Sequence, residues 1–276
     1  MGGILILSPR RLTQRFNNMI LYKYCDLRGM DILKSCRLKA TPIAYFNDPM
    51  EWSFQANSEE DRRDGELDYF RQPQGHQYFL ESFDSLLGVI CFSKVPDSLL
   101  MWSHYSDNHN GLVFGFDTDK FPEILRHTLS PVQYSRNKVK WNRNWEQDKK
   151  DEGAYNLCLT KSIDWSYEKE WRTIVSLEDC SKKEVGMWKK RSLYFVPIPA
   201  QSIVRVIMGA RCDPKKVLKK LMWHGLKLEN RVPFERAKPD SKKYQLNFSN
   251  IIDPRPESIQ KNLTKASTRR QEARRR

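Results

Sequence analysis

Short runs of apolar residues along the chain predict a series of strands separated by short helices. In Leu112–Asp117 the apolar Leu112, Phe114 and Phe116 alternate with Val113, Gly115 and Asp117, which is the period of two typical of a strand. Further strands are predicted at Ile20–Tyr24, Leu38–Thr41, Leu86–Ser93, Val132–Tyr134, Tyr167–Ser176, Leu193–Val196, Ile203–Met208, Leu226–Val232 and Tyr244–Phe248. Because strands and helices do not alternate regularly, the pattern predicts one α+β domain with a mixed, mainly antiparallel sheet.

Helices are predicted where apolar residues recur at helical spacing or where a capping residue precedes them. Asp97 or Ser98 caps a short helix through Leu99–Trp102, and Asp213 caps a helix whose apolar face includes Val217 and Leu221. Asp48, Pro49 and Glu51 have the spacing of a capping box with proline at the first helical position. The remaining helices are predicted at Asp26–Cys36, Glu59–Asp68, Lys120–His127 and Asn137–Lys150, the last as a solvated helix anchored by two tryptophans.

Charge is distributed unevenly along the chain. The 48 basic and 34 acidic residues give a formal net charge of +14. Residues 261–276 contain seven basic residues, one acid and almost no apolar residue, so we expect residues 251–276 to form a disordered basic tail. Residues 19–250 are predicted to form the folded domain, and 1–18 an N-terminal extension, with Met19 an alternative start. The tail is expected to bind polyanions weakly.

The cysteines and the N-terminus indicate the compartment. The six cysteines form no C-x-x-C pair or zinc-ribbon spacing, so we expect reduced thiols and no structural metal. The apolar run Gly2–Leu7 is too short for a signal peptide or a membrane span. A cytoplasmic protein without a membrane partner is therefore expected.

Two stretches concentrate reactive side chains. Leu100–Asp117 contains His104, Tyr105 and His109 beside Trp102, on a predicted helix end and loop held by a strand, where sites usually lie. In the predicted strand Tyr167–Ser176, Glu168, Glu170 and Arg172 share one face. Two neighbouring carboxylates repel, so one is expected to hold its proton more tightly unless Arg172 neutralises it. The alternative interpretation of the same pattern is a ladder of salt bridges between neighbouring strands.

Several motifs in order resemble a bacterial family of proteins of unknown function, the domain family 2971. They are Leu21–Tyr24, Phe46–Glu51, Cys91–Ser93, the Met-Trp-Ser-His-Tyr of Met101–Tyr105, Lys161, and Asp164–Arg172. The resemblance covers about Leu21 to Cys212 and names a family rather than a function.

The order of these elements also resembles the ADP-ribosyltransferase fold, and that resemblance implies an enzyme that transfers ADP-ribose from NAD to a protein or nucleic-acid acceptor. Tyr24 or Lys23 would then contact the NAD ribose, and Tyr105 would pack on the nicotinamide. Glu170 would stabilise the positive charge that develops on the ribose, with Glu168 as a second carboxyl that takes a proton. His104 and His109 would border the cofactor. At the first position, the His or Arg expected of that fold is replaced by Lys23 or Tyr24.

Two other classes of function remain open from the sequence. His104, Asp107 and His109, with Asp48 and Glu51, could ligate a metal in a hydrolase or nuclease, although their spacing matches no one-face helical pair. A non-catalytic nucleic-acid-binding module is favoured by the pI near 9.5 and by the basic residues that alternate with Trp141 and Trp145.

Overall fold

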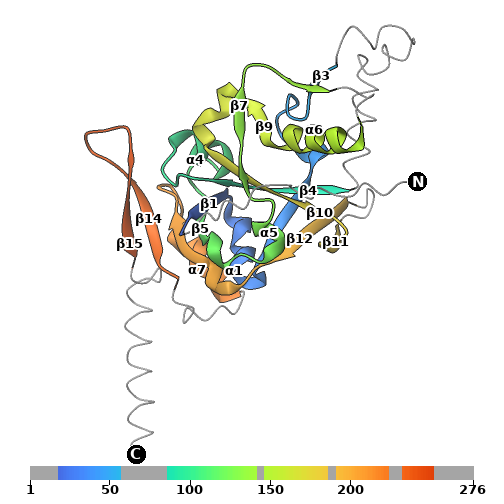
Figure 1. The fold of residues 1–276 in the computed structure, drawn as a ribbon. Helices are drawn as coiled ribbons and strands as arrows, with labels where there is room; N and C mark the ends of the chain where they lie inside the picture. The colour runs from blue at the N-terminus through green and yellow to red at the C-terminus, as the bar shows by residue number, and fades with distance from the viewer. Residues whose placement is uncertain (1–17, 57–85, 142–145, 186–190, 224–231, 252–276) are drawn as a thin grey trace, which may run out of the picture. The chain divides into compact units, whose positions relative to one another are not determined.

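The computed structural model describes residues 18–56, 86–141, 146–185, 191–223 and 232–251. It is an α+β protein with mixed, mostly antiparallel strand pairing and short helices, as the sequence predicted (Figure 1). The chain divides into two compact units. Unit 1 comprises Met1–Leu21, Arg37–Val95 and Asp117–Ser202, and unit 2 comprises Tyr22–Cys36, Pro96–Phe116 and Ile203–Arg276. The predicted domain limits at residues 19 and 250 stay predictions.

Unit 1 is built around the antiparallel pair β4 and β10, whose seven paired positions run from Glu170 opposite Ser93 to Ser176 opposite Leu87. The other strands of this sheet extend from the pair, with order β11-β12-β2-β4 and with β6 beside β10. Their bounds are β2 Arg37–Pro42, β4 Leu87–Ser93, β6 Ser130–Pro131, β10 Glu170–Ser176, β11 Ser181–Val185 and β12 Arg191–Pro197. β4 is an unbroken apolar run, and most of its residues are buried, as expected of a strand covered on both faces.

Two short parallel pairs and a helix complete unit 1. β3 (Phe54–Ala56) pairs with β8 (Val139–Trp141), and β7 (Gln133–Ser135) pairs with β9 (Thr160–Ser162). α6 (Gln147–Leu159) leads directly into β9. The other described helices of unit 1 are single turns or little more: α5 (Glu123–Arg126) and the 3-10 helices η2 (Ile43–Tyr45), η4 (Thr118–Lys120), η5 (Ile163–Glu168) and η6 (Ala200–Ser202). Trp52, Leu157 and Ile174 belong to one buried apolar cluster, which fixes the turn after η2 against the end of α6.

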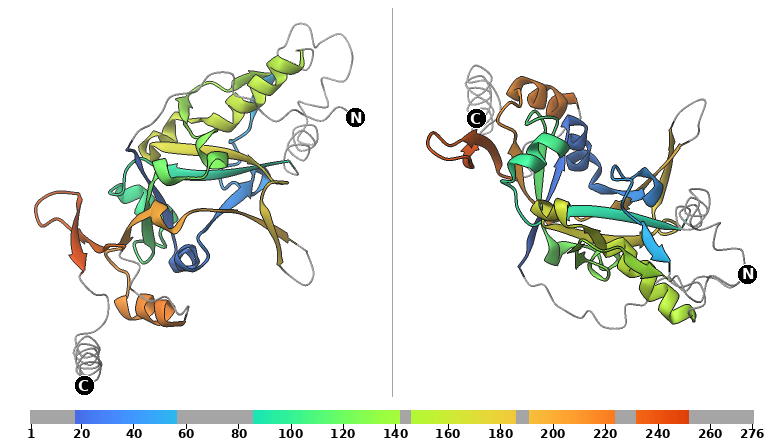
Figure 2. Two further views of the ribbon diagram at one scale, coloured as in Figure 1. Left: turned by 60° about the horizontal axis from the view of Figure 1, so that its bottom comes forward. Right: turned by 90° about the horizontal axis from the view of Figure 1, so that it is seen from above.

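Unit 2 has the strand order β1-β5-β13-β14-β15, in which β13 and β14 are parallel and the pairs on either side of them are antiparallel. The bounds are β1 Ile20–Cys25, β5 Leu112–Asp117, β13 Ile203–Met208, β14 Phe234–Pro239 and β15 Leu246–Ile251. The helices are η1 Leu27–Met30, α1 Asp31–Ser35, α4 Leu99–Tyr105 and α7 Pro214–Trp223. Of the two predicted caps, Asp97 and Ser98, it is Ser98 that caps α4, by accepting from Met101 N–H. The turn between β14 and β15 projects beyond the other elements of unit 2 in all three ribbon views (Figures 1 and 2).

Several predicted elements are corrected by the structure. Phe46–Glu51 leads into turns and then β3 rather than into a helix, because Glu51 is drawn into a buried ion-pair cluster instead of a cap. The segment predicted as a solvated helix, Asn137–Lys150, contains β8, and the helix α6 begins only at Gln147. Glu168 ends the 3-10 helix η5, so the strand starts at Glu170.

Other predictions differ in extent or fall elsewhere. The helix predicted at Lys120–His127 is limited to Glu123–Arg126, and Tyr244 lies in the turn before β15. Glu59–Asp68, most of Leu226–Val232, the extension before Asn18 and the tail after Ile251 lie outside the described residues. Among the helices of the described ranges, none is long and apolar enough to cross a membrane.

Candidate functional site

A cluster of five charged side chains is buried in unit 1. It comprises Glu51, Lys161, Glu168, Glu170 and Arg172. Lys161 Nζ lies 2.6 Å from Glu168 Oε2, 3.2 Å from Glu51 Oε1 and 3.3 Å from Glu170 Oε2. Arg172 donates from Nε to Glu170 Oε1 at 2.8 Å, and its Nη2 contacts Glu51. Glu168 and Glu170 therefore both contact Lys161, although Glu168 is not on the strand as predicted, and Arg172 contributes a second cation to the cluster.

Local backbone geometry brings the two carboxylates together. Lys169, between them, has a left-handed backbone with φ of 44°, which ends η5 and starts β10. Glu168 is fixed where its carbonyl accepts the Ser93 hydroxyl at 2.6 Å. Glu170 and Arg172 are two residues apart on β10 and share a face. The cluster thus joins the turn that carries Glu51, the strand β9 that carries Lys161, and the start of β10.

Ion pairing has a larger effect than burial on the pKa of Glu170. Burial raises the pKa of the Glu170 carboxyl, but the charges of Arg172 and Lys161 lower it by a larger amount, so that the pKa falls to about 2. Burial lowers the pKa of Lys161, and the three surrounding carboxylates raise it overall. Glu170 and Lys161 therefore stay charged at neutral pH. This is the exception expected from the sequence, in which Arg172 neutralises a carboxyl of the pair, here together with Lys161.

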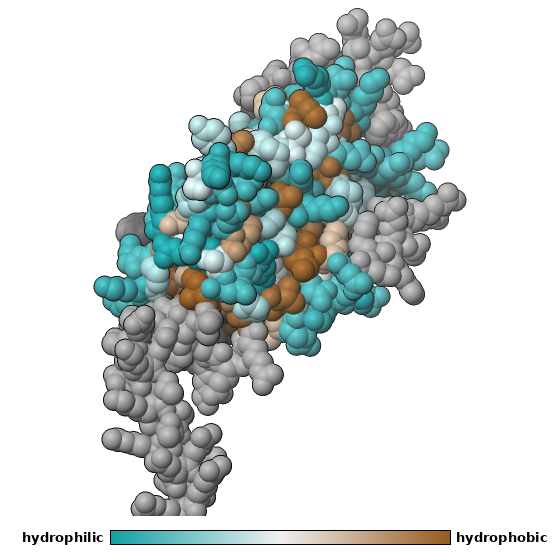
Figure 3. Space-filling view, turned by 90° about the vertical axis from the view of Figure 1, so that its left-hand side faces the viewer, coloured by the Kyte–Doolittle hydropathy of each residue, from teal (hydrophilic) through white to brown (hydrophobic). Residues whose placement is uncertain are grey.

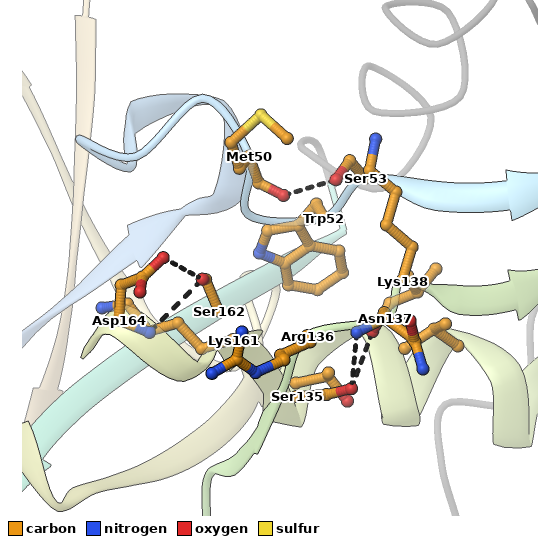
Figure 4. Close-up of a pocket in the computed structure, with 13 residues that line it drawn as sticks. Met50, Trp52, Ser53, Ser135, Arg136, Asn137, Lys138, Lys161, Ser162 and Asp164 are labelled. Atoms are coloured by element: carbon orange, nitrogen blue, oxygen red, sulfur yellow. Dashed lines mark hydrogen bonds between the residues drawn. The ribbon is translucent and has the colours of Figure 1, made fainter. Parts of the chain in front are cut away.

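A cavity of about 260 Å³ adjoins the cluster within unit 1. Buried Trp52, Leu157 and Lys161 form its inner wall, and Arg136 and Lys138 contribute exposed cations (Figure 4). Among the described residues, Asp164 is the one acid that lines the cavity, and the remaining lining residues are Met50, Ser53, Ser135, Asn137, Val139, Thr160 and Ser162. Glu168 and Glu170 are not among the lining residues, so Lys161 is the link between cavity and cluster.

The indole of Trp52 is the one buried donor of this cavity without an acceptor among the described residues. Trp52 is 2% exposed and has a left-handed backbone with φ of 65°. In Figure 4 the nitrogen edge of the ring faces the side of the cavity where Ser162 and Asp164 lie. A buried N–H without an acceptor costs about 1–3 kcal/mol, so an acceptor that reached this nitrogen would be stabilised.

Two of the predicted residues of unit 2, Tyr24 and His109, pack on Trp102. Tyr24 contacts the Trp102 ring edge-on at 5.5 Å between centroids, and the His109 ring stacks on it at 6.0 Å. Trp102 itself is fully buried and donates its indole N–H to Pro96 O at 2.8 Å. Burial raises the pKa of Tyr24, so its hydroxyl stays neutral, and burial followed by the charge of Arg211 lowers the pKa of His109.

Backbone contacts, as well as ring contacts, hold His109 in place. Asp107, Asn108 and His109 all have positive φ, and the carbonyl of His109 accepts from the N–H of Arg211 at 3.0 Å. A Cβ on Gly209 would lie 2.0 Å from that carbonyl oxygen, so only glycine fits there. Nδ1 of His109 is buried and has no partner among the described residues.

The seven predicted site residues are divided between the two units. Glu168 and Glu170 belong to unit 1, whereas Lys23, Tyr24, His104, Tyr105 and His109 belong to unit 2. Within unit 2, the structure brings Tyr24 and His109 onto Trp102, and His104 contacts Tyr105 edge-on at the end of α4. Across the described residues, no group of three or more His, Cys, Asp or Glu side chains is arranged to hold a metal ion.

Sequence reasoning missed three residues of the unit 1 site. Glu51 was assigned to a cap or to a possible metal site, Lys161 was recognised as part of a motif without a role, and Trp52 was given no role. The ion-pair partners of Lys161 and Glu51 lie 7 to 121 positions away in the sequence. A lone charged residue beside an apolar one carries no signal of such a contact. Only the excess of two glutamates, Glu168 and Glu170, over the single Arg172 could have suggested a second cation.

Comparison with known families gives one match. The model of the family described as "Protein of unknown function (DUF2971)" matches residues 101–173. This confirms the resemblance over α4, β5 and the chain through to the first half of β10, a narrower span than the motifs suggested. The comparisons with curated proteins and with solved structures found no match.

Proposed function

We propose that this protein binds a nucleotide, with NAD as the first candidate, and that the cavity of unit 1 holds a phosphate-bearing part of it. The observation that carries the proposal is the indole N–H of Trp52, which is buried without an acceptor in a cavity that also presents Arg136 and Lys138. Among the described residues neither cation forms an ion pair. Exposed cations beside a neutral donor favour phosphate oxygens, which accept several hydrogen bonds at once.

The size of the cavity limits how much of the ligand it holds. About 260 Å³ lies just below the roughly 300–1,000 Å³ typical of ligand pockets. A phosphate with its sugar fits such a volume, whereas a complete dinucleotide exceeds it. We therefore propose that one half of NAD, or a mononucleotide, enters the cavity and that any remainder lies outside it.

When bound, NAD would supply a glycosidic bond whose cleavage leaves positive charge on the ribose. Glu168 and Glu170 do not fit that task in the described arrangement, because each accepts a hydrogen bond from Lys161 or Arg172 and neither lines the cavity. Transfer of ADP-ribose to a protein or nucleic-acid acceptor, with Glu170, Glu168 and Tyr105 as catalytic residues, therefore stays a prediction. Nucleotide binding is the part of that prediction that the described residues support.

The proposal includes a cytoplasmic setting. All six cysteines are free thiols, and reduced thiols are the normal state of cytoplasmic proteins. A nucleotide ligand is consistent with that compartment. A metal-dependent hydrolase, the other class of enzyme considered from the sequence, gains no supporting observation from the described residues.

Isothermal titration calorimetry with NAD, AMP and inorganic phosphate tests the proposal. We expect Trp52→Phe, which removes the N–H and keeps a ring, and Arg136→Gln each to weaken binding about fivefold or more, the equivalent of one good hydrogen bond. Arg126→Gln and Lys140→Gln remove exposed charges of unit 1 outside the cavity and should leave the affinity unchanged.

Two results would overturn the proposal. One is a wild type that binds none of the three ligands. The other is binding that Arg126→Gln and Lys140→Gln weaken as much as Arg136→Gln does, since that would trace the affinity to net charge rather than to the cavity. Thermal unfolding of each variant shows that the fold is retained.

A further inference from the structure

We propose that the turn between β14 and β15 is a binding site for single-stranded nucleic acid, in which Tyr244 stacks on a base and Lys242 and Lys243 contact the backbone phosphates. The turn belongs to unit 2 and does not depend on the nucleotide cavity proposed for unit 1. Its residues, Asp240 to Gln245, were not distinguished by any motif in the sequence.

The turn is held in one conformation by a single carboxylate. Asp240 Oδ1 accepts from the backbone N–H groups of Lys242 at 2.8 Å and Lys243 at 2.9 Å. Asp240 Oδ2 accepts from the Asn247 side chain at 2.8 Å, and the N–H of Asp240 donates to Gln245 O at 3.0 Å. The chain across this turn is therefore ordered before any partner binds, which lowers the entropy lost on binding.

This ordered turn presents an aromatic ring to solvent. Tyr244 is fully exposed, and the other large exposed hydrophobic residues are about half-exposed. On the face drawn in Figure 3, hydrophobic residues form small groups between hydrophilic ones. A tyrosine held clear of the surface on a rigid turn has no packing role, because it buries no area within its own chain.

The residues around Tyr244 define the charge of the partner. Lys242 and Lys243 precede it and Lys238 lies on β14, and all three are exposed. None of them forms an ion pair with a described residue, and Asp240 is the one acid in the turn. An aromatic ring among exposed cations fits a partner that offers both flat ring faces and phosphates.

Single strands fit this turn better than the other polyanionic partners. In a duplex the bases are stacked on each other, so a protruding ring finds no free base face. An anionic membrane would be matched by additional apolar residues that enter the lipid, but the neighbours here are Ser241, the lysines and Gln245. We therefore take a membrane surface as an outcome for the test to exclude.

Fluorescence anisotropy with the full chain and a labelled single-stranded oligodeoxyadenylate tests the proposal. Tyr244→Ser should weaken binding about fivefold or more, as expected for the loss of one stacked base, while Tyr244→Phe should retain it. The double variant Lys242→Gln/Lys243→Gln should lower the slope of log affinity against log salt by about 1.4, which is roughly 0.7 for each phosphate contact.

The matched control is Lys215→Gln/Lys216→Gln, which removes an adjacent pair of exposed lysines in α7 of the same unit. It should leave both affinity and slope at the wild-type values. The proposal fails if the control lowers the slope as much, if Tyr244→Ser binds like the wild type, or if the wild type does not bind the oligonucleotide. It fails equally if Tyr244→Ser loses binding to phosphatidylserine vesicles and not to the oligonucleotide.

Discussion

Lys161 Nζ lies 2.6 Å from Glu168 Oε2 although the two side chains are only 4% and 3% exposed. Removing such a pair from water costs several kcal/mol per ion, and the cost is offset only where the remaining hydrogen bonds are also made. Here Glu51 and Glu170 complete the environment of Lys161. The stability of the Lys161–Glu168 pair therefore depends on every residue of the cluster, so removing any one of them should destabilise the fold.

Lys161→Met tests the cluster directly. The substitution leaves three buried carboxylates with Arg172 as their remaining cation, so we expect a loss of about 3–5 kcal/mol in the free energy of unfolding. Urea denaturation measures it. Lys140→Met, at an exposed position of β8, serves as the control, and a loss below about 1 kcal/mol for Lys161→Met would show that the cluster contributes no more than a surface pair.

The pH dependence of stability should report Glu170. Its pKa is lowered from 4.5 to about 2 in the folded protein, so the charged form is favoured by folding. The stabilisation is present above the unfolded pKa and is lost as the pH falls from about 4.5 toward 2. Urea unfolding at a series of pH values should show this loss in the wild type.

Glu170→Gln cannot titrate at this position and is the variant to compare. Its free energy of unfolding should be lower at neutral pH and should fall less steeply than that of the wild type between pH 4.5 and 2. Parallel curves for the two proteins would mean that another carboxyl carries the acid dependence.

The same variant tests whether Glu170 has a catalytic role in addition to its structural one. Glu170 does not line the cavity, so we expect Glu170→Gln to bind NAD like the wild type under conditions where it is folded. NAD hydrolysis and transfer are then measured alongside binding. Loss of turnover with retained binding would support the transferase, with Glu168→Gln expected to reduce transfer more than hydrolysis, and unchanged turnover would assign Glu170 to the ion-pair cluster alone.

Trp102→Ala should destabilise the protein by about 3–5 kcal/mol, as large-to-small changes in a core do. Trp102 is fully buried, and both Tyr24 and His109 pack on its ring. Trp165 is only partly buried, so Trp165→Ala should cost less. Thermal or urea unfolding of the two variants measures both losses of stability. A fully stable Trp102→Ala protein would contradict the packing role of Trp102.

The sequence by itself determined the features that depend on neighbouring residues. The alternation in Leu112–Asp117 and the apolar run ending at Ser93 placed β5 and β4 correctly, and Ser98 identified the start of α4. Period and capping are local properties, so they can be read from a few adjacent positions. The choice of α+β with mainly antiparallel pairing followed from the same local signals.

The tertiary structure alone decided what Glu51, Trp52 and Lys161 do. The spacing of Asp48 and Glu51 fits a helix cap, but two buried cations attract the Glu51 carboxylate more strongly than a backbone N–H at a helix end does. Likewise, Glu168 and Glu170 are equivalent in a strand pattern until Lys169 takes a left-handed conformation and separates helix from strand. Electrostatic partners distant in sequence set these roles, because the energy of a buried charge depends on which groups the fold brings within a few ångströms of it.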